Sequence, residues 1–439
     1  MKKTLTTAIA AIVLAASAFA QPGYKPSQEI IEARKEFDSD RFGIFIHWGI
    51  YSMLGQGEWN MQVDSLNYKE YAHLAGGFYP SKFDAREWVR AFKNAGARYL
   101  TITSRHHDGF SMFDTAVSDY DVVDATPFGR DVIGEIAQAC QEEGIKLHLY
   151  YSHLDWGRTD FYPRGRTGNG TGRPDSGDWN SYLKFMDDQL TELLTKYGPI
   201  GAIWFDGIWD KDAYPREDQP EIWNLYGQYE LIHRLQPGCM VGNNHHMLPF
   251  EGEDMQIFER DVPGENEYGY SGQEISKLPL ETCQTMNWSW GYRIKDVWYK
   301  SSEDLIRYLV KTAGKGANLL LNIGPRPDGT LPDVALERLA AMGEWLGVYG
   351  ESIYGTKAGY VGEQEWGTST QKDKALFLHV LKHQDNITIP ADSKPKGVFN
   401  YASGKKLKYV YKKGLLTIEA GPDSGIIDDV IVVEFKKAL

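Results

Sequence analysis

Short apolar runs recur along the first three quarters of the chain, and stretches with helical periodicity separate most of them. Runs of this length are typical of strands buried on both faces of a sheet. The expected strands span residues 42–49, 98–104, 145–152, 201–207, 239–244, 256–259, 285–292 and 318–324. The expected helices span residues 81–95, with Ser81 as the N-cap, 131–143, 182–197, 220–235, 302–313 and 332–346. Alternating strands and helices predict a parallel sheet, and eight strands predict a closed barrel.

The pattern changes after about residue 354. Short β-type runs follow at residues 375–381, 386–389, 406–411, 415–420 and 429–435, separated by Gly, Asp, Asn and Lys without helical periodicity. Such runs predict a small antiparallel sandwich. The expected fold class is therefore α/β: a (β/α)₈-like TIM barrel over residues 21–354, irregular near its sixth strand, followed by a β-sandwich over residues 355–439.

Residues 1–20 have the features of a secretory signal peptide. Lys2 and Lys3 form a positive start, residues 8–16 form an apolar core, and Ala18-Phe19-Ala20 matches a cleavage site. The apolar core is too short to span a bilayer, and no later apolar run is long enough. The sequence thus predicts a bacterial, exported and periplasmic protein without membrane insertion.

Composition narrows the function classes. The net charge of −13 gives no basic footprint for nucleic acid. The 13 Trp and 26 Tyr residues suggest carbohydrate, because aromatic rings stack on the apolar faces of sugars as well as filling cores. Cys140, Cys239 and Cys283 are odd in number and widely spaced, so we expect buried thiols and no disulfide framework. Nothing in the sequence indicates the oligomeric state.

The candidate chemistry lies where the expected strands end. Polar or aromatic residues at these ends are His47, His106, His107, Tyr151, Asp206, Asn243, Glu259 and Trp290. In a barrel, the carboxyl ends of all strands meet at one rim, which carries the catalytic groups. Two carboxylates at that rim suggest retaining glycoside hydrolysis, with an ionised nucleophile and a protonated acid about 5 to 5.5 Å apart. Asp206 fits the ionised nucleophile, and Glu259, after an apolar pair, fits the acid with the raised pKa.

Each of these residues also has a structural interpretation. Asp206 could cap the next helix, Glu259 could pair with Arg260 at the surface, and a histidine could be bonded to a backbone carbonyl in the core. His106 and His107 would point to opposite sides of a regular strand. Histidines and acids at a barrel rim also occur in metal-dependent hydrolases, and a non-catalytic glycan-binding protein is a further alternative.

Several motifs resemble glycoside hydrolase family 29, the retaining α-L-fucosidases, over about residues 25–355. The motifs are His47-Trp48-Gly49, Glu58-Trp59, His106-His107-Asp108-Gly109-Phe110, Trp204-Phe205-Asp206-Gly207, Ser289-Trp290-Gly291-Tyr292 and Leu320-Leu321-Asn322-Ile323-Gly324-Pro325. The resemblance implies the same order of barrel and β-sandwich. It also implies an exo-acting enzyme that releases terminal L-fucose from a fucosylated oligosaccharide or glycoconjugate, with no cofactor and no metal.

Site residues follow from the resemblance by position. Asp206 matches the nucleophile, and fucose-binding positions are matched by His47, Glu58, Trp59, His106, His107, Tyr151 and Trp290. Glu259 is the first choice for the acid/base, Glu281 the second and Glu58 the third. Many relatives carry an arginine after the fifth strand, where this chain has Asn243-Asn244-His245-His246, so contacts near the leaving group are expected to differ.

Overall fold

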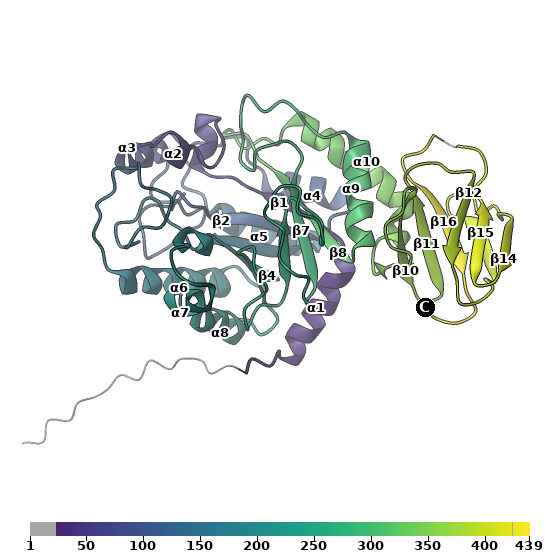
Figure 1. The fold of residues 1–439 in the computed structure, drawn as a ribbon. Coiled ribbons are helices and arrows are strands. Elements are labelled where there is room, and N and C mark those ends of the chain that lie inside the picture. The colour runs from purple at the N-terminus through teal and green to yellow at the C-terminus, as the bar shows by residue number, and fades with distance from the viewer. Residues whose placement is uncertain (1–22, 424) are drawn as a thin grey trace, which may run out of the picture.

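The computed structural model describes residues 23–423 and 425–439 (Figure 1). The expected signal peptide at residues 1–20 lies outside this range. Within the described chain, no helix is long and apolar enough to cross a membrane.

The first part of the chain forms a parallel barrel sheet. Its strands are β1 (Phe42–Ile46), β2 (Tyr99–Arg105), β3 (Lys146–Ser152), β4 (Ala202–Asp206), β5 (Met240–Asn244), β6 (Gln256–Glu259), β7 (Leu280–Thr285) and β8 (Ala317–Ile323). Their order, β5-β4-β3-β2-β1-β8-β7-β6, follows the chain around the barrel. In the described structure no ladder joins β5 to β6; the amide of Asp254 instead donates to the Val241 carbonyl at 2.7 Å. The barrel is thus nearly closed, and its irregular edge lies beside the sixth strand, as expected.

Helices surround this sheet (Figure 1). They are α1 (Gln28–Asp40), α4 (Ala85–Asn94), α5 (Val132–Glu143), α6 (Trp179–Lys196), α7 (Gln219–Ile222), α8 (Leu225–Leu235), α9 (Ser302–Gly314) and α10 (Asp333–Tyr349). Short elements in the loops are η1 (Ile50–Leu54), α2 (Asn60–Val63), α3 (Tyr68–Ala72), η2 (His73–Gly77), η3 (Ile208–Lys211), η4 (Arg216–Asp218) and η5 (Gly350–Ser352). The expected helices are all present, with two differences. The N-cap of α4 is Asp84 rather than Ser81, and the helix expected at 220–235 is broken where Asn224 adopts a positive φ of 52°.

The seventh strand was predicted in the wrong place. Strand β7 spans Leu280–Thr285, whereas residues 285–292 form the loop that follows it and carry Trp290. The cause is the polar character of β7. Its Glu281 points into the barrel, where it is buried and satisfied by two hydrogen bonds. An apolar pattern therefore marks the aromatic loop more strongly than the true strand.

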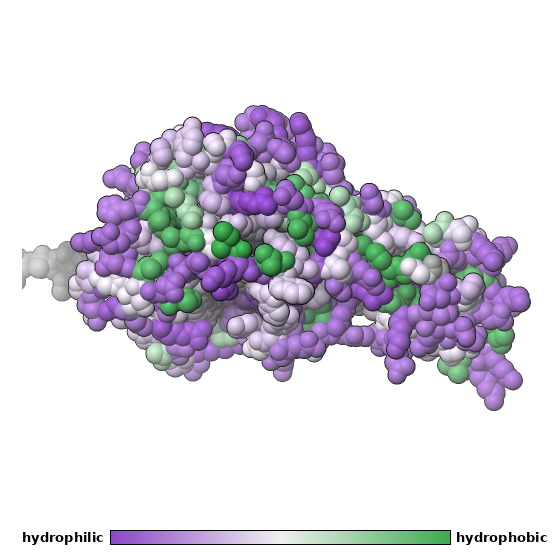
Figure 2. All heavy atoms as spheres, turned by 90° about the horizontal axis from the view of Figure 1, so that it is seen from above, coloured by the Kyte–Doolittle hydropathy of each residue, from purple (hydrophilic) through white to green (hydrophobic). Residues whose placement is uncertain are grey.

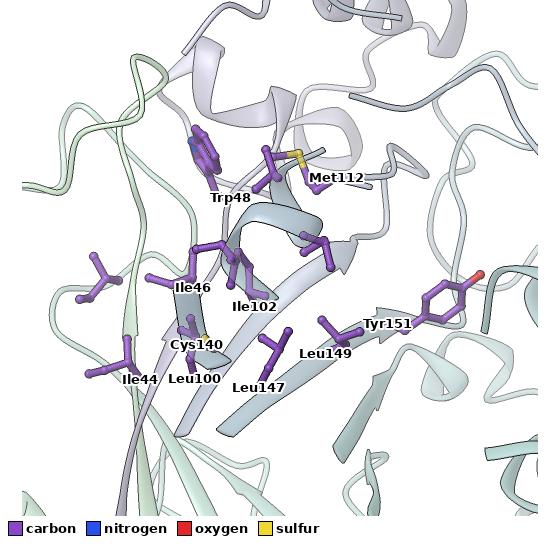
Figure 3. Close-up of a cluster of buried hydrophobic side chains, with 14 of the residues drawn as sticks. Ile44, Ile46, Trp48, Leu100, Ile102, Met112, Cys140, Leu147, Leu149 and Tyr151 are labelled. Carbon is purple, nitrogen blue, oxygen red and sulfur yellow. The ribbon is translucent and has the colours of Figure 1, made fainter. Parts of the chain in front are cut away.

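The strands alternate between two environments. Ile44, Ile46, Leu100, Ile102, Leu147 and Leu149 pack outward against the helices, together with Cys140 of α5 (Figure 3). Tyr151 lies on the same side of β3 as Leu147 and Leu149 (Figure 3). Because successive side chains of a strand face opposite ways, Tyr150 points into the barrel. All three cysteines are buried and free, as predicted.

Antiparallel sheets follow the barrel. One has the order β13-β16-β11-β10-β9 and the other β12-β15-β14. Their strands are β9 (Lys357–Ala358), β10 (Gly367–Lys372), β11 (Ala375–Val380), β12 (Asn386–Pro390), β13 (Gly397–Asn400), β14 (Tyr409–Lys412), β15 (Leu415–Glu419) and β16 (Asp429–Glu434). A separate apolar cluster fills this unit, including Leu376, Leu378, Ile387, Ile418 and Ile431. The sequence did not indicate β9, β10 or β13, because β9 and β13 are very short and β10, Gly-Thr-Ser-Thr-Gln-Lys, is polar.

A buried arginine forms hydrogen bonds with both the barrel and the segment that leads into the antiparallel unit. The guanidinium of Arg41, at the start of β1, donates to the carbonyls of Gly316 before β8 and Thr356 before β9. Helix α9 also packs against β9 and β10, on the side of the barrel that faces the antiparallel sheets (Figure 1). The predicted boundary after residue 354 lies between η5 and β9 and stays a prediction.

Candidate active site

A pocket of about 350 Å³ lies at the carboxyl ends of the barrel strands. Figure 2 shows this end of the molecule, where apolar residues lie among strongly polar ones. The pocket is lined by Phe45, His47, Glu58, Trp59, His106, His107, Tyr150, Arg166, Trp204, Asp206, Trp209, Asn244, His246, Glu259, Arg260, Tyr270, Cys283 and Trp290. Most of the predicted site residues are therefore brought together, and Tyr151 and Glu281 are not.

Asp206 sits at the last position of β4 with three hydrogen-bond donors around its carboxylate. The Tyr150 hydroxyl donates to Oδ2 at 3.0 Å, while Trp209 Nε1 and the Gly207 amide donate to Oδ1 at 2.8 Å each. Gly207 has a φ of 99°, which a residue with a Cβ rarely adopts, and this turn lets its amide reach back. Each donor stabilises the ionised carboxylate.

Burial acts in the opposite direction on this carboxyl group. Burial and, to a lesser extent, the neighbouring charge of Glu259 raise the pKa of Asp206 to about 7, against the three donors. Burial thus opposes the ionised form that we expected for Asp206, and the three donors favour it. Asp206 and Glu259 line the same pocket, so the negative charge of Glu259 disfavours the ionised form of Asp206.

Glu259 ends β6 and faces the same pocket. Asn244, at the end of β5, donates from Nδ2 to Glu259 Oε2 at 2.9 Å, and His246 Nε2 lies 3.7 Å from that oxygen. Asn243, which we placed at the rim, instead points outward and donates to the Tyr229 hydroxyl. Asn244 and His246 thus both line the pocket and lie beside Glu259, whereas Asn243 does not line it.

Three buried histidines form one wall. Burial lowers the pKa of His47 to about 3 and those of His106 and His107 well below the ordinary value, so all three are neutral at pH 7. His47 Nδ1 donates to Asn322 Oδ1 at 2.7 Å, and His107 Nδ1 lies 2.7 Å from Ser152 Oγ. Because His47 Nδ1 donates, the Nε2 of this neutral ring is an acceptor and can take a hydrogen bond from a sugar hydroxyl, while His107 Nε2 lies 3.6 Å from Asp206 Oδ2.

His106 and His107 both line the pocket although they are adjacent. Strand β2 ends at Arg105, and its register against β3 shifts between Thr103 and Arg105. The two histidines therefore follow the strand in a turn, with ring centroids 4.2 Å apart. In the described chain, the buried atoms His106 Nδ1 and Asn244 Oδ1 have no hydrogen-bond partner, which suits a ligand rich in hydroxyls.

Glu58 and two tryptophans close the other sides. The Glu58 carboxylate accepts from the Gly291 amide at 2.7 Å and from Ser289 Oγ at 3.3 Å, and burial raises its pKa. Trp59 stacks on Trp209 with a centroid distance of 5.8 Å and an interplanar angle of 15°. Trp290 lines the pocket from its loop, where Asn322 Nδ2 donates to its carbonyl at 2.7 Å.

The prediction that Tyr151 contacts the substrate is wrong. Its hydroxyl donates to Gln189 on α6 at 2.8 Å, behind the sheet, and its side chain is fully buried there. Tyr150 takes the place expected for it: its hydroxyl bonds to Asp206, and His106 stacks on its ring at 5.4 Å. The alternation of β3 contained this signal, because Leu147 and Leu149 mark the outward face and share it with Tyr151.

Glu281, the second choice for the acid/base, lies inside the barrel and does not line the pocket. It accepts hydrogen bonds from Tyr99 at 2.6 Å and from Trp204 Nε1 at 2.8 Å, and burial raises its pKa to about 7. Trp204 itself lines the pocket. Glu281 is thus a support for the pocket floor. Sequence reasoning also missed Trp209, Arg166 and Tyr270, which come from loops whose path no local pattern indicates, and it placed Asn243 rather than its neighbour Asn244 at the rim.

The histidines and acids do not form a metal-binding set. Across residues 23–423 and 425–439, no group of three His, Cys, Asp or Glu side chains is arranged to hold a metal ion. The metal-dependent alternative therefore has no donor set in this part of the chain.

Comparison with known proteins agrees with the motifs and the geometry. The sequence profile of the family described as alpha-L-fucosidase matches residues 11–351. Human tissue alpha-L-fucosidase is 30% identical over 419 residues, which is 89% of this chain and 83% of that protein. The mouse tissue enzyme is 30% identical over 397 residues, covering 84% of this chain and 80% of that one.

Solved structures show the same architecture. Alpha-L-fucosidase isoenzyme 1 from Paenibacillus thiaminolyticus superposes with a TM-score of 0.82 at 32% identity, covering 93% of this chain and all of that one. Thermotoga maritima alpha-fucosidase in complex with a mechanism-based inhibitor gives a TM-score of 0.74 at 28% identity, covering 94% and 100%. The profile match spans most of the chain, and the chain therefore belongs to the α-L-fucosidase family, glycoside hydrolase family 29.

Proposed function

We propose that this protein is an exo-acting, retaining α-L-fucosidase that releases terminal L-fucose from a fucosylated oligosaccharide or glycoconjugate. The observation that carries the proposal is that Asp206 and Glu259 face one pocket lined by neutral histidines and tryptophans, in a chain of this family. The pocket floor consists of barrel side chains such as Phe45 and Trp204, so a glycan cannot thread through it. Such a pocket accepts a sugar at the end of a glycan, which is exo action.

The reaction proceeds in two displacements. The Asp206 carboxylate attacks the anomeric carbon while the Glu259 carboxyl gives its proton to the glycosidic oxygen, so the bond to the aglycone breaks and a fucosyl ester of Asp206 forms. Glu259, now ionised, takes a proton from water, which attacks the same carbon and breaks the ester. Two inversions give net retention, and both acids return to their initial states.

The surroundings of Asp206 suit a nucleophile that is charged in one step and esterified in the next. Three donors hold the free carboxylate in place, and ester formation removes the charge that burial disfavours. The neutral histidines bind hydroxyl groups without adding positive charge that would compete with the developing charge on the sugar ring. A protein that only bound glycans would gain nothing from two partly buried acids in one pocket, where the charge of Glu259 raises the pKa of Asp206.

Asp206→Asn is expected to lower kcat for an aryl α-L-fucoside by about a thousandfold or more, because the amide is no nucleophile. The amide has almost the same shape, so the thermal unfolding curve should stay close to that of the parent. Steady-state kinetics with purified protein test this, and turnover within tenfold of the parent would reject Asp206 as the nucleophile.

Glu259→Ala is expected to slow hydrolysis of the fucosyl ester, and added azide should restore turnover of an aryl fucoside with α-L-fucosyl azide as product. Azide needs no general base and occupies the space of the lost carboxyl group. Glu281→Gln is the matched control, which should show no azide effect. Rescue confined to a Glu281→Ala variant would overturn the assignment.

Tyr150→Phe and Tyr151→Phe remove hydroxyls from adjacent residues on opposite faces of β3. In the parent, kcat/KM should be lost as pH falls through about 7, because Asp206 becomes protonated. Tyr150→Phe removes a donor to the ionised form, so the acidic limb should move up by about one pH unit. Tyr151→Phe should keep the profile and lower the free energy of unfolding by about 1 kcal/mol. If the acidic limb of the kcat/KM profile did not shift in Tyr150→Phe, the hydrogen bond from Tyr150 would have no role in setting the pKa of Asp206.

We also propose that the protein is exported, in a bacterium, to the periplasm, on the basis of the signal-peptide features of residues 1–20. Expression in a host with a periplasm should yield a mature chain that begins at Gln21, as N-terminal sequencing would show. Replacing Ala18 and Ala20 by Leu should block cleavage. An uncleaved parent chain retained in the cytoplasm would contradict export.

A further inference from the structure

The aromatic side chains around the pocket differ in exposure between its two acids. On the side of Asp206, Trp59 and Trp209 are stacked on each other and half-buried. On the side of Glu259, Tyr268, Tyr270 and Trp288 remain exposed, at 40%, 47% and 61%. We call these three residues the aromatic collar. Large exposed aromatic groups that gather beside a functional pocket indicate a surface that binds something.

Each member of the collar is connected to Glu259 through one residue. The Tyr270 ring lies 5.6 Å from the ring of His246, and His246 Nε2 lies 3.7 Å from Glu259 Oε2. Arg260 connects the other two members, with its guanidinium 5.8 Å from the Tyr268 ring and its Nη2 donating to the Trp288 carbonyl at 2.7 Å. Tyr270, His246 and Arg260 all line the pocket, so the collar continues its wall outward.

The collar backbone is held in place although its rings are exposed. The Tyr268 amide donates to Asp261 Oδ2 at 3.0 Å, and the Trp288 amide donates to Asp296 Oδ2 at 2.9 Å. Ser271 Oγ, next to Tyr270, donates to the Glu259 carbonyl at 3.0 Å. Rings on a fixed backbone lose little conformational freedom when a ligand covers them, so they bind at low entropic cost.

The chemistry of the reaction decides which part of the substrate reaches the collar. Glu259 must reach the glycosidic oxygen, so the group attached to that oxygen leaves on the side of Glu259. A pyranose has an apolar face of C–H groups and a rim of hydroxyls. Aromatic rings with an arginine and a histidine beside them complement both features, because the rings cover the C–H face and the polar groups reach the hydroxyls.

We propose that the aromatic collar is the binding site for the aglycone of the substrate, and that this aglycone is a pyranose of a fucosylated oligosaccharide. The inference rests on the proposed function, because it identifies the leaving side by the role of Glu259. The substrate class is accordingly a glycan with at least one sugar after fucose, which the collar binds by stacking. A leaving group without any ring, such as fluoride, offers Trp288 no face to stack on.

The test compares two substrates that differ only in the leaving group. α-L-Fucosyl fluoride has no aglycone ring, whereas a fucosylated trisaccharide offers pyranoses to the collar. Trp288→Ala and Tyr268→Ala, which change collar residues outside the pocket lining, should each lower kcat/KM for the trisaccharide about three- to tenfold, the range of one aromatic contact, and leave kcat/KM for the fluoride within twofold. Trp288→Phe, which keeps a ring, should recover most of the loss.

Tyr360→Ala is the matched control, because Tyr360 is 44% exposed and lies between β9 and β10 of the antiparallel unit. This variant should leave kcat/KM unchanged for both substrates. If the collar variants lost kcat/KM equally on both substrates, or lost none on the trisaccharide, the collar would not be the aglycone site. Activity of the parent protein on the fluoride would still uphold the proposed function. A parent protein that is inactive on the fluoride would instead overturn the proposed function itself, and the collar with it.

Discussion

Two partly buried carboxyl groups that line one small pocket impose the main constraint on this barrel. Asp206 lies in surroundings that raise its pKa, and the nearby charge of Glu259 adds to that effect. A charge there persists only where donors compensate for lost water. The chain supplies them from β3, from the turn after β4 and from η3, as Tyr150, Gly207 and Trp209. The strand ends must therefore stay in register, and the barrel provides that register.

The layer below the pocket serves the same purpose. Glu281 accepts from Tyr99 and Trp204, so a buried acid of β7 orients an indole of β4 that lines the pocket. Asn322 of β8 acts similarly, because its amide accepts from His47 and donates to the Trp290 carbonyl. Polar side chains inside the barrel weaken the apolar pattern of their strands, but their hydrogen bonds fix the rotamers on which recognition depends.

The rim of the pocket is asymmetric, and the asymmetry matches the proposed reaction. Tryptophans pack on one another where the terminal sugar must be enclosed, and aromatic rings stay exposed where the rest of the glycan must leave. The positions after β5 also fit this division. In place of an arginine there, Asn244 and His246 contact Glu259, and the pocket draws positive charge from Arg260 and Arg166. Arg260, directly after β6, has a positive φ of 64°.

Much of this arrangement follows from the sequence. The apolar runs and helical periods predicted the barrel, the antiparallel unit and the strand ends at His47, Asp206 and Glu259, because burial on two faces leaves a pattern that local residues record. The motifs indicated the family to which the chain belongs. The register of β7 was missed because its polar residues face a buried interior, so their partners lie on other strands.

Only the tertiary structure decided the rest. It selected Tyr150 over Tyr151, placed Glu281 under the pocket floor, and brought loop residues such as Trp209 and Tyr270 to the rim. A sequence records which side chains prefer burial, but the direction in which a side chain points and the partner it meets depend on strand alternation and on loops that close over a distance. The sequence by itself thus determined the elements and the chemical groups, and packing between distant segments determined which of those groups face the pocket.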